Sequence, residues 1–266
     1  MRSLLVLVSA LSLAACSTSS GESPADAGAE EPGDADVAGV FDAGTKPGPD
    51  AGTPAPDAAS VPLPGRKVLL YTGAGGGGPT SDLYLSDVAS TLQAAGIAST
   101  TSESLPSGFA NDYGVLWLMN PMQSVPADVS AAAKALLERG GRVVLVLDHC
   151  KNGCWSDADG DNDLLTTLGS AIRVSGTGGA PLSETTLQIT PVPKITDGVS
   201  SVVVYYSGSV TGGTIFGRVP GGDGVMAYQT VGLGDVVTIA DTSAFGYALS
   251  EGDNTRLIAN LSVPRR

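Results

Sequence analysis

The chain has few of the residues on which common chemistries depend. Its 266 residues include one histidine and three cysteines, and only 14 lysines and arginines stand against 27 aspartates and glutamates. A single histidine excludes metal centres built from several imidazoles. A net charge of −13 argues against nucleic acid and against anionic lipid surfaces as partners, because both bind proteins through lysine and arginine. Electrostatic attraction to polyanions is therefore not expected.

The sequence also lacks a long apolar run beyond its N-terminal segment. Arg2 precedes a short apolar stretch, residues 4–13, which suits an export signal better than a permanent membrane span. The stretch ends in LAAC, with the cysteine at Cys16, and this resembles the lipobox of bacterial lipoproteins. The resemblance implies cleavage before Cys16 and a lipid anchor on it. Ser17 stands where aspartate would indicate retention at the inner membrane, so we expect the outer membrane.

Residues 17–65 differ in composition from the rest of the chain. They are rich in Ala, Gly, Pro, Ser and Asp and contain one base, Lys46, and one aromatic residue, Phe41. Such a segment cannot bury enough apolar surface to offset the entropy of ordering. We predict a flexible tether that reaches about 40 Å. The expected organisation is a signal peptide over residues 1–16, this tether, and one folded domain over residues 66–266.

The folded part begins with strands and helices in alternation. Short apolar strands are expected at 67–71, 115–119 and 142–147, and helices at 81–95 and 126–139. Strands separated by single helices favour a mostly parallel sheet with flanking helices, which is an α/β fold. After residue 170 the composition becomes rich in Thr, Ser, Val and Gly. We expect an antiparallel β extension there, with strands near 187–190, 201–206, 214–218 and 224–228, then a core strand at 235–240 and a helix at 254–261.

Four segments resemble one family. Residues 139–149 read RGGRVVLVLDH, residues 161–169 read DNDLLTTLG, residues 195–199 read ITDGV, and residues 232–245 read GLGDVVTIADTSAF. Their order and spacing resemble class I glutamine amidotransferase-like domains of the uncharacterised type that lack the catalytic triad. The resemblance covers most of residues 66–266 and implies a flavodoxin-like α/β sheet.

Cys150 lies where true glutamine amidotransferases carry their nucleophile. Such a cysteine needs a histidine as its base, and no histidine follows His149 in the sequence. His149 is also adjacent to Cys150, and neighbours in extended chain point to opposite sides. Glutaminase activity is therefore not expected. A degenerate hydrolase or acyl transferase that uses Asp148, His149, Cys150 or Ser243 is kept as the alternative to a non-catalytic binding module.

With Cys16 lipidated, Cys150 and Cys154 are the remaining pair. An exported protein meets an oxidising compartment, so we predict a disulfide between them, with free thiols as the alternative. No cofactor is expected other than calcium, which the next segment raises.

Four aspartates alternate just beyond this pair, at Asp157, Asp159, Asp161 and Asp163. Alternating carboxylates resemble the first half of a calcium loop, but leucine stands at position 168, where such a loop carries its bidentate glutamate. Aspartates at the start of a helix explain the same pattern as caps. Calcium and capping both remain open, and zinc is disfavoured by the shortage of soft ligands.

The glycine-rich stretch 73–78 contains a G-x-G-x-x-G spacing, but Pro79 and Thr80 stand between it and the expected helix, so nucleotide binding is not expected. It does follow the first strand, and open α/β sheets bind ligands at the carboxyl ends of their strands. We expect a ligand edge formed by Gly75, Asn120, Asp148, His149, Asp241 and Ser243. The predicted function is binding or scaffolding at the cell envelope, with a protein, peptide or glycan as partner.

Overall fold

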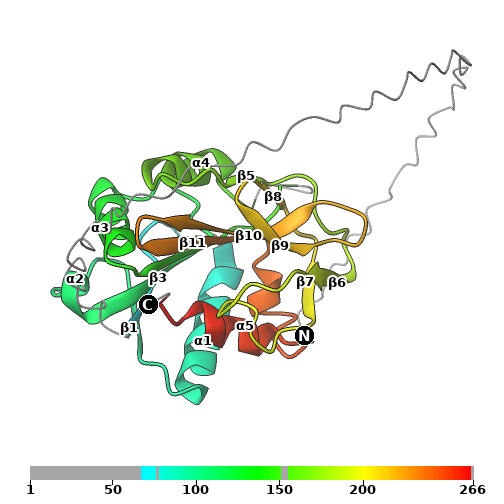
Figure 1. Ribbon diagram of the computed structural model, residues 1–266, viewed down its shortest axis with the longest axis horizontal. Coiled ribbons are helices and arrows are strands. Elements are labelled where there is room, and N and C mark those ends of the chain that lie inside the picture. Colours follow the sequence, from blue (N-terminus) through cyan, green and yellow to red (C-terminus); the bar gives the residue numbers. More distant parts are fainter. Residues whose placement is uncertain (1–66, 76–77, 151–154, 265–266) are drawn as a thin grey trace, which may run out of the picture. The chain divides into compact units, whose positions relative to one another are not determined.

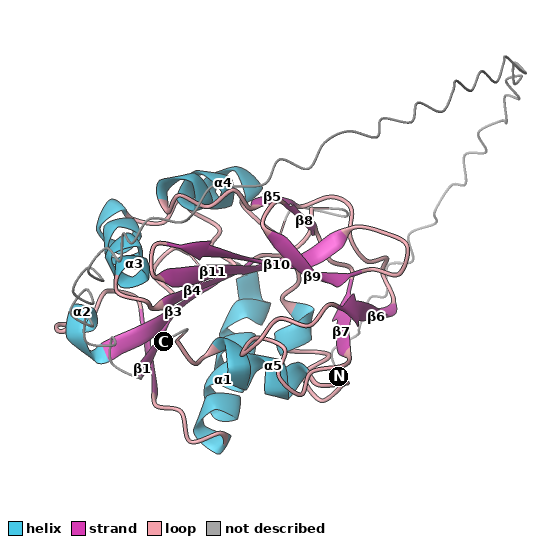
Figure 2. Ribbon diagram, viewed as in Figure 1, coloured by secondary structure: helices cyan, strands magenta, loops and turns pink. Residues whose placement is uncertain are grey.

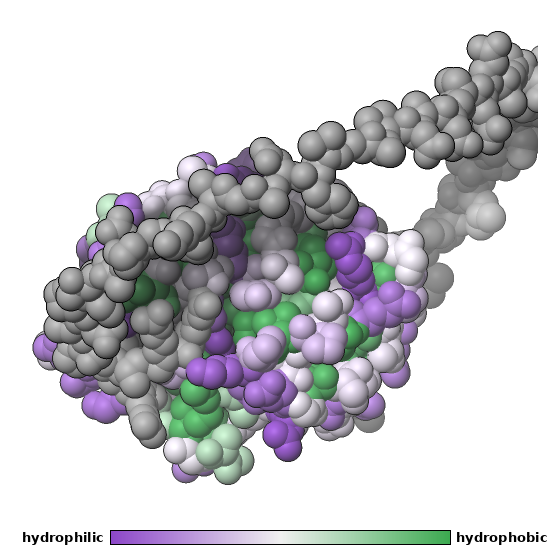
Figure 3. All heavy atoms as spheres, in the orientation of Figure 1, coloured by the Kyte–Doolittle hydropathy of each residue, from purple (hydrophilic) through white to green (hydrophobic). Residues whose placement is uncertain are grey.

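The computed structural model describes residues 67–75, 78–150 and 155–264, with the backbone alone for residues 78–83. The predicted signal peptide, Cys16, the tether and Cys154 lie outside the described residues. In the described part of the chain, no helix is both long and apolar enough to span a bilayer. The face of the domain seen in Figure 3 mixes hydrophilic with hydrophobic residues.

The described residues form eleven strands, five α-helices and one short 3-10 helix. The strands are β1 (Lys67–Tyr71), β2 (Ser99–Ser102), β3 (Tyr113–Met119), β4 (Arg142–Val146), β5 (Arg173–Ser175), β6 (Glu184–Ile189), β7 (Val202–Tyr205), β8 (Ser209–Thr211), β9 (Thr214–Arg218), β10 (Gly224–Val231) and β11 (Gly234–Ile239). The helices are α1 (Gly78–Ala94), α2 (Phe109–Asp112), α3 (Ala127–Glu138), α4 (Ala158–Thr167), η1 (Ser243–Phe245) and α5 (Asn254–Leu261).

The eleven described strands belong to one sheet, and nine of them follow the order β2-β1-β3-β4-β11-β10-β9-β6-β7. Off this path, β8 pairs with β10 and, antiparallel, with β5. Strands β2, β1, β3, β4 and β11 are parallel neighbours. The pairs of β10 with β11, β9 and β8, and those of β6 with β9 and β7, are antiparallel. The α/β class is confirmed, but the prediction of a mostly parallel sheet is wrong, because the sheet is mixed and its helices are few.

The mixed sheet follows from short connections in the second half of the domain. Strands β10 and β11 are joined by Gly232 and Leu233 alone, and Gly232 has a φ of 60°. Two residues can only reverse the chain, whereas a parallel crossover needs a dozen residues or more. Glycine takes such a left-handed φ without strain. Short turns of this kind therefore give antiparallel pairing in the second half of the domain, whereas helices connect the parallel strands of the first half.

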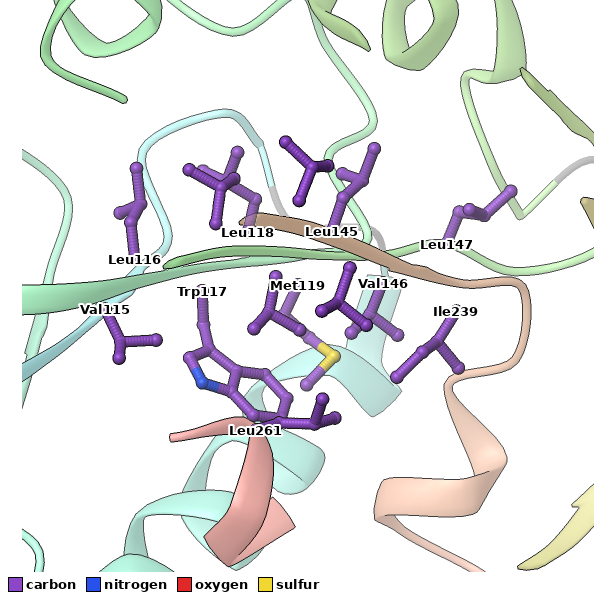
Figure 4. Packing of buried hydrophobic residues seen from close by; sticks show 14 of the residues in the cluster. Val115, Leu116, Trp117, Leu118, Met119, Leu145, Val146, Leu147, Ile239 and Leu261 are labelled. Carbon is purple, nitrogen blue, oxygen red and sulfur yellow. The ribbon is translucent and has the colours of Figure 1, made fainter. Parts of the chain in front are cut away.

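The central strands are covered on both faces, and every residue of β3 and β4 is buried. Figure 4 shows Leu116, Leu118, Leu145 and Leu147 on one side of the sheet and Val115, Trp117, Met119, Val146 and Ile239 on the other, where Leu261 of α5 joins them. Helices α3 and α4 lie on one side, and α1 and α5 on the other (Figures 1 and 2). Burial on both faces explains the continuous apolar runs from which these strands were predicted.

The parallel strands β3, β4 and β11 end at one edge of the sheet. Asn120 follows β3, Asp148 and His149 follow β4 after one further leucine, and Asp241 follows β11 after one alanine. The opposite edge carries the start of β4 and β11, where Arg142 is paired with Asp235. The fold therefore separates a polar carboxyl edge from a buried ion pair at the amino edge.

Candidate functional site

A cavity of about 520 Å³ lies at the carboxyl edge of the parallel strands. Its polar wall comes from two strand ends, with Asp148 and His149 after β4 and Thr242 and Ser243 after β11. The size lies within the range of small-molecule sites, which occur at this edge of open α/β sheets. The structure thus brings together three of the residues expected at the ligand edge, Asp148, His149 and Ser243.

The remaining wall of the cavity is mainly aromatic. Tyr84 comes from α1, Tyr205 ends β7, Tyr206 follows it, Tyr247 follows η1, and Trp155 lies just before α4. Sequence reasoning missed all five, because four separate segments of the chain supply them. One sequence feature could have indicated an aromatic site. The chain has only seven tyrosines, and two of them are adjacent directly after the buried run of β7.

The rim of the cavity exposes apolar surface. Among the described residues five large hydrophobic side chains are exposed, and three of them line this cavity: Trp155 (42%), Leu182 (72%) and Tyr247 (75%). Single exposed hydrophobic residues are ordinary, but a cluster around a concavity marks a surface that binds something. The exposed apolar side chains of the rim therefore indicate a binding surface and not a void left by imperfect packing.

The aromatic rings are inclined to one another. The centroids of Tyr84 and Tyr247 are 5.7 Å apart with an interplanar angle of 76°. Those of His149 and Tyr206 are 4.0 Å apart at 46°. Gly246 allows the first arrangement, because a Cβ at that position would lie 1.8 Å from Cε1 of Tyr84. Burial is the largest cause that raises the pKa of Tyr84, followed by the charge and hydrogen bond of Tyr247.

Asp241 lies behind the cavity wall and is fully buried. Its Oδ1 accepts hydrogen bonds from the Ser243 backbone N–H (2.7 Å) and the Ser243 hydroxyl (2.6 Å), and its Oδ2 accepts one from the Tyr205 N–H (2.8 Å). The pKa of Asp241 is raised to about 7, chiefly by burial and also by the charge of Asp148, against the lowering effect of these bonds. This carboxyl group connects η1 to β7 and fixes Ser243 and Tyr205 at the cavity.

Asp148 lines the cavity directly. Its Oδ1 accepts a hydrogen bond from the His149 N–H at 2.8 Å, and its Oδ2 accepts one from the Thr242 hydroxyl. The Nε2 atom of His149 lies 3.8 Å from Oδ1 of Asp148. Asp148 therefore joins the loop after β4 to the loop after β11, and each of its oxygens already accepts a hydrogen bond from the protein.

The structure separates the other two predicted edge residues from this wall. Gly75 is exposed with a φ of 64°, and its loop is held by the N–H groups of Met122 and Gln123, which both donate to the Ala74 carbonyl. Asn120 is buried with a φ of 48°, and its N–H donates to the Val146 carbonyl. Neither lines the cavity. The glycine-rich loop thus packs on the loop after β3.

Cys150 packs away from the cavity lining. Its N–H donates to the Gly176 carbonyl at 2.6 Å, and a Cβ on Gly176 would lie 2.6 Å from its Sγ. Close approach to this backbone therefore requires glycine at position 176. Because Cys154 lies outside the described residues, the disulfide between Cys150 and Cys154 stays a prediction.

The alternating aspartates stand at the start of α4. Asp157 is the N-cap, and its carboxylate accepts a hydrogen bond from the Gly160 N–H at 3.2 Å. The helix turns Asp159 and Asp163 outward, where both are exposed, and buries Asp161. The described residues contain no group of three or more His, Cys, Asp or Glu side chains that could hold a metal ion. Capping accounts for Asp157, and calcium stays an untested prediction.

Comparisons with known proteins bear on the fold. No family model matches the sequence, and the search of curated proteins finds no match. A cytoplasmic protein from Salmonella typhimurium LT2 has a similar structure, with a TM-score of 0.54 and 12% identity over 74% of this chain and 98% of its own. The β-galactosidase from Bacillus circulans sp. alkalophilus gives 0.51 and 15%, over 76% of this chain and 32% of the enzyme.

A ThuA-like protein from Bacteroides uniformis ATCC 8492 gives a TM-score of 0.48 and 14% identity, over 79% of this chain and 94% of its own. Structural neighbours thus include ThuA-like proteins, which have a glutamine amidotransferase-like fold, and glycosidases, all at low identity. At such identities the likeness concerns the fold alone, and the chain is similar to these proteins only as an α/β domain.

Proposed function

We propose that this domain is a non-catalytic binding module for a small organic ligand, held at the outer membrane by a lipid on Cys16. The observation that carries the binding role is the aromatic cavity, whose rim exposes Trp155, Leu182 and Tyr247. The export and anchoring part rests on the signal-like segment and on LAAC at residues 13–16. A folded cavity on a long tether would present its ligand site to the surrounding envelope.

The charge of the cavity restricts its ligand. Asp148 lines it and Asp241 lies behind it, and its described lining contains no lysine or arginine. An anionic ligand would meet the Asp148 carboxylate in a partly desolvated site, and the one basic side chain of the described lining, His149, lies 3.8 Å from that same carboxylate. The ligand is therefore neutral or cationic, with apolar surface to cover the aromatic side chains.

A hydrolase remains the alternative because of the contact between Ser243 and Asp241. The Ser243 hydroxyl donates to Asp241 at 2.6 Å, and burial raises the pKa of that carboxyl to about 7, so Asp241 is a candidate base for the serine. The binding role is favoured because Ser243 is only 7% exposed and its oxygen also accepts a hydrogen bond from the Tyr205 N–H. Its hydrogen bonds thus serve to position backbone.

The binding role is tested by titrating the full-length chain, solubilised in detergent, with choline, glucose and acetate. Trp155 and the buried Trp117 are the only tryptophans, so a ligand in the cavity changes the fluorescence of Trp155. We expect a saturable change with choline or glucose and none with acetate, and we expect it to disappear in Trp155→Leu. A response to acetate alone, or to none of the three compounds, would contradict the proposal.

The hydrolase alternative is tested with p-nitrophenyl acetate. Because Ser243 holds Asp241 and Tyr205 in our interpretation, Ser243→Ala should change the rate of ester hydrolysis by less than about twofold. Removal of a true nucleophile costs several orders of magnitude. Thr242→Ala is the matched control, since it removes a neighbouring hydroxyl from the same wall. A hundredfold loss confined to Ser243→Ala would establish the catalytic role.

A further inference from the structure

The inclined rings around the cavity suit a rounded ligand group. A sugar ring stacks through one face of C–H groups on a single planar platform, whereas Tyr84 and Tyr247 stand at 76° to each other and His149 and Tyr206 at 46°. Rings at such angles present π faces and edges from several directions. A compact group with apolar surface on all sides can contact several of them together.

The carboxylates and the Ser243 hydroxyl at the cavity already take part in hydrogen bonds within the protein, although the lining also carries tyrosine hydroxyl groups. Both oxygens of Asp148 accept bonds from the protein, and so do both oxygens of Asp241. The Ser243 hydroxyl is held between Asp241 and Tyr205. A polyhydroxylated ligand needs acceptors and donors with free directions. A quaternary ammonium group has no N–H to satisfy and responds to negative charge without a defined direction.

Charge and aromatic surface act together in this cavity. Asp148 places a carboxylate at the wall, and no lysine or arginine of the described lining offsets it. Aromatic faces attract cations through their quadrupole, and the attraction is strongest where water is excluded. A volume of about 520 Å³ exceeds what a trimethylammonium head alone requires, so the site also has room for the rest of a larger molecule.

We infer that the cavity is a site for an organic cation with a quaternary ammonium head, enclosed by the rings of Tyr84, Trp155 and Tyr247 and attracted by Asp148. The inference rests on the binding function proposed above and specifies its ligand class. The head sits against the aromatic rim, and the substituent extends along Leu182, which is exposed beside it.

The experiment compares choline with 3,3-dimethylbutan-1-ol, its uncharged isostere, on the full-length chain in detergent by calorimetry. Both compounds have the same shape and hydroxyl, so a difference in affinity reports the positive charge. We expect choline to bind at least about fivefold more tightly, which corresponds to roughly 1 kcal/mol of cation–π and Coulomb attraction.

Variants separate the ring from the charge. Tyr247→Leu keeps apolar bulk and removes a π face. Asp148→Asn removes the charge and keeps one of the two acceptor oxygens that serve His149 and Thr242. Each should weaken choline at least about fivefold and the isostere by less than about twofold. Leu182→Ala is the matched control, and it should change both affinities by the same factor.

Two outcomes overturn the inference and leave the binding function standing. One is equal affinity for choline and the isostere, which would mean that the cavity senses apolar surface alone. The other is tighter binding of glucose than of choline, with loss of that binding in Trp155→Leu. Absence of binding by choline, the isostere and glucose together would overturn both the ligand class and the binding function.

Discussion

Replacing Arg142 with alanine is expected to lower the free energy of unfolding by about 3–5 kcal/mol. Arg142 and Asp235 are 1% and 2% exposed, and their side chains form a bidentate pair, with Nε 2.7 Å from Oδ1 and Nη2 2.9 Å from Oδ2. Nη1 also donates to the Asn260 carbonyl at 2.8 Å. Truncation leaves the buried Asp235 carboxylate without its guanidinium donors and removes one donor from the Asn260 carbonyl, which is the costly way to break such a pair.

The position of the Arg142–Asp235 pair explains why its removal should destabilise the whole domain. Arg142 begins β4, Asp235 lies at the start of β11, and Asn260 is in the last turn of α5. One guanidinium group thus connects two neighbouring parallel strands to the C-terminal helix. Since the pair lies at the amino edge of the sheet, ligand affinity measured on the folded variant should not change.

A double-mutant cycle in urea measures this coupling through the fluorescence of buried Trp117. Arg142→Met and Asp235→Leu are the single variants, and the double variant replaces the pair by apolar side chains. Because the desolvation of two charges is then removed together, the double variant should be more stable than either single variant. Single variants that cost under about 1 kcal/mol each would show that the pair contributes little.

Local patterns predicted the central elements well, because their burial is uniform. The continuous apolar runs at 115–119 and 142–147 correspond to β3 and β4, and residues 254–261 form α5 as expected. β2 carries only a weak strand pattern, because its sequence STTS is polar and partly exposed at the edge of the sheet. Among the described strands β2 pairs with β1 alone, and no local pattern reveals this pairing.

The candidate site was predicted only where it follows strand ends. Asp148, His149 and Ser243 lie directly after β4 and β11, so the α/β topology alone places them at one edge. The aromatic residues could not be placed in this way. Tyr84 and Tyr205 are brought to the cavity by the packing of α1 and by the antiparallel half of the sheet, which depends on long-range pairing. The negative charge of the cavity could be predicted from Asp148 in the sequence, but the aromatic side chains that surround it could not.

Asp161→Asn is expected to flatten the pH dependence of stability. Asp161 is 2% exposed, and burial, with the charge of Asp157 as the next cause, raises its pKa from 3.8 to about 8. Between these two values the folded chain keeps a proton that the unfolded chain has lost. The free energy of unfolding of the wild type therefore decreases as pH rises, by up to about 1.4 kcal/mol per pH unit from this group.

Asp161 differs from an ordinary carboxylate in the direction of its effect on stability and in the pH range over which that effect is lost. Its favourable contribution is complete below about pH 4 and is lost by about pH 8, whereas a carboxylate with a lowered pKa stabilises the protein at high pH. Asp241, with a pKa raised to about 7, adds a second decrease that ends near pH 7 and persists in the variant. Asp161→Asn should therefore remove about half of the slope between pH 4 and 7 and all of it between pH 7 and 8.

Urea unfolding curves at each pH unit from 4 to 9 measure this slope, and Asp163→Asn is the matched control. Asp163 lies on the same helix two residues later but is exposed, so removal of its charge leaves the slope of the wild type in place. Equal slopes for the two variants would mean that Asp161 is ionised in the folded chain. Because a buried ionised carboxylate needs a compensating cation, that result would also support the prediction of a metal ion at the start of α4.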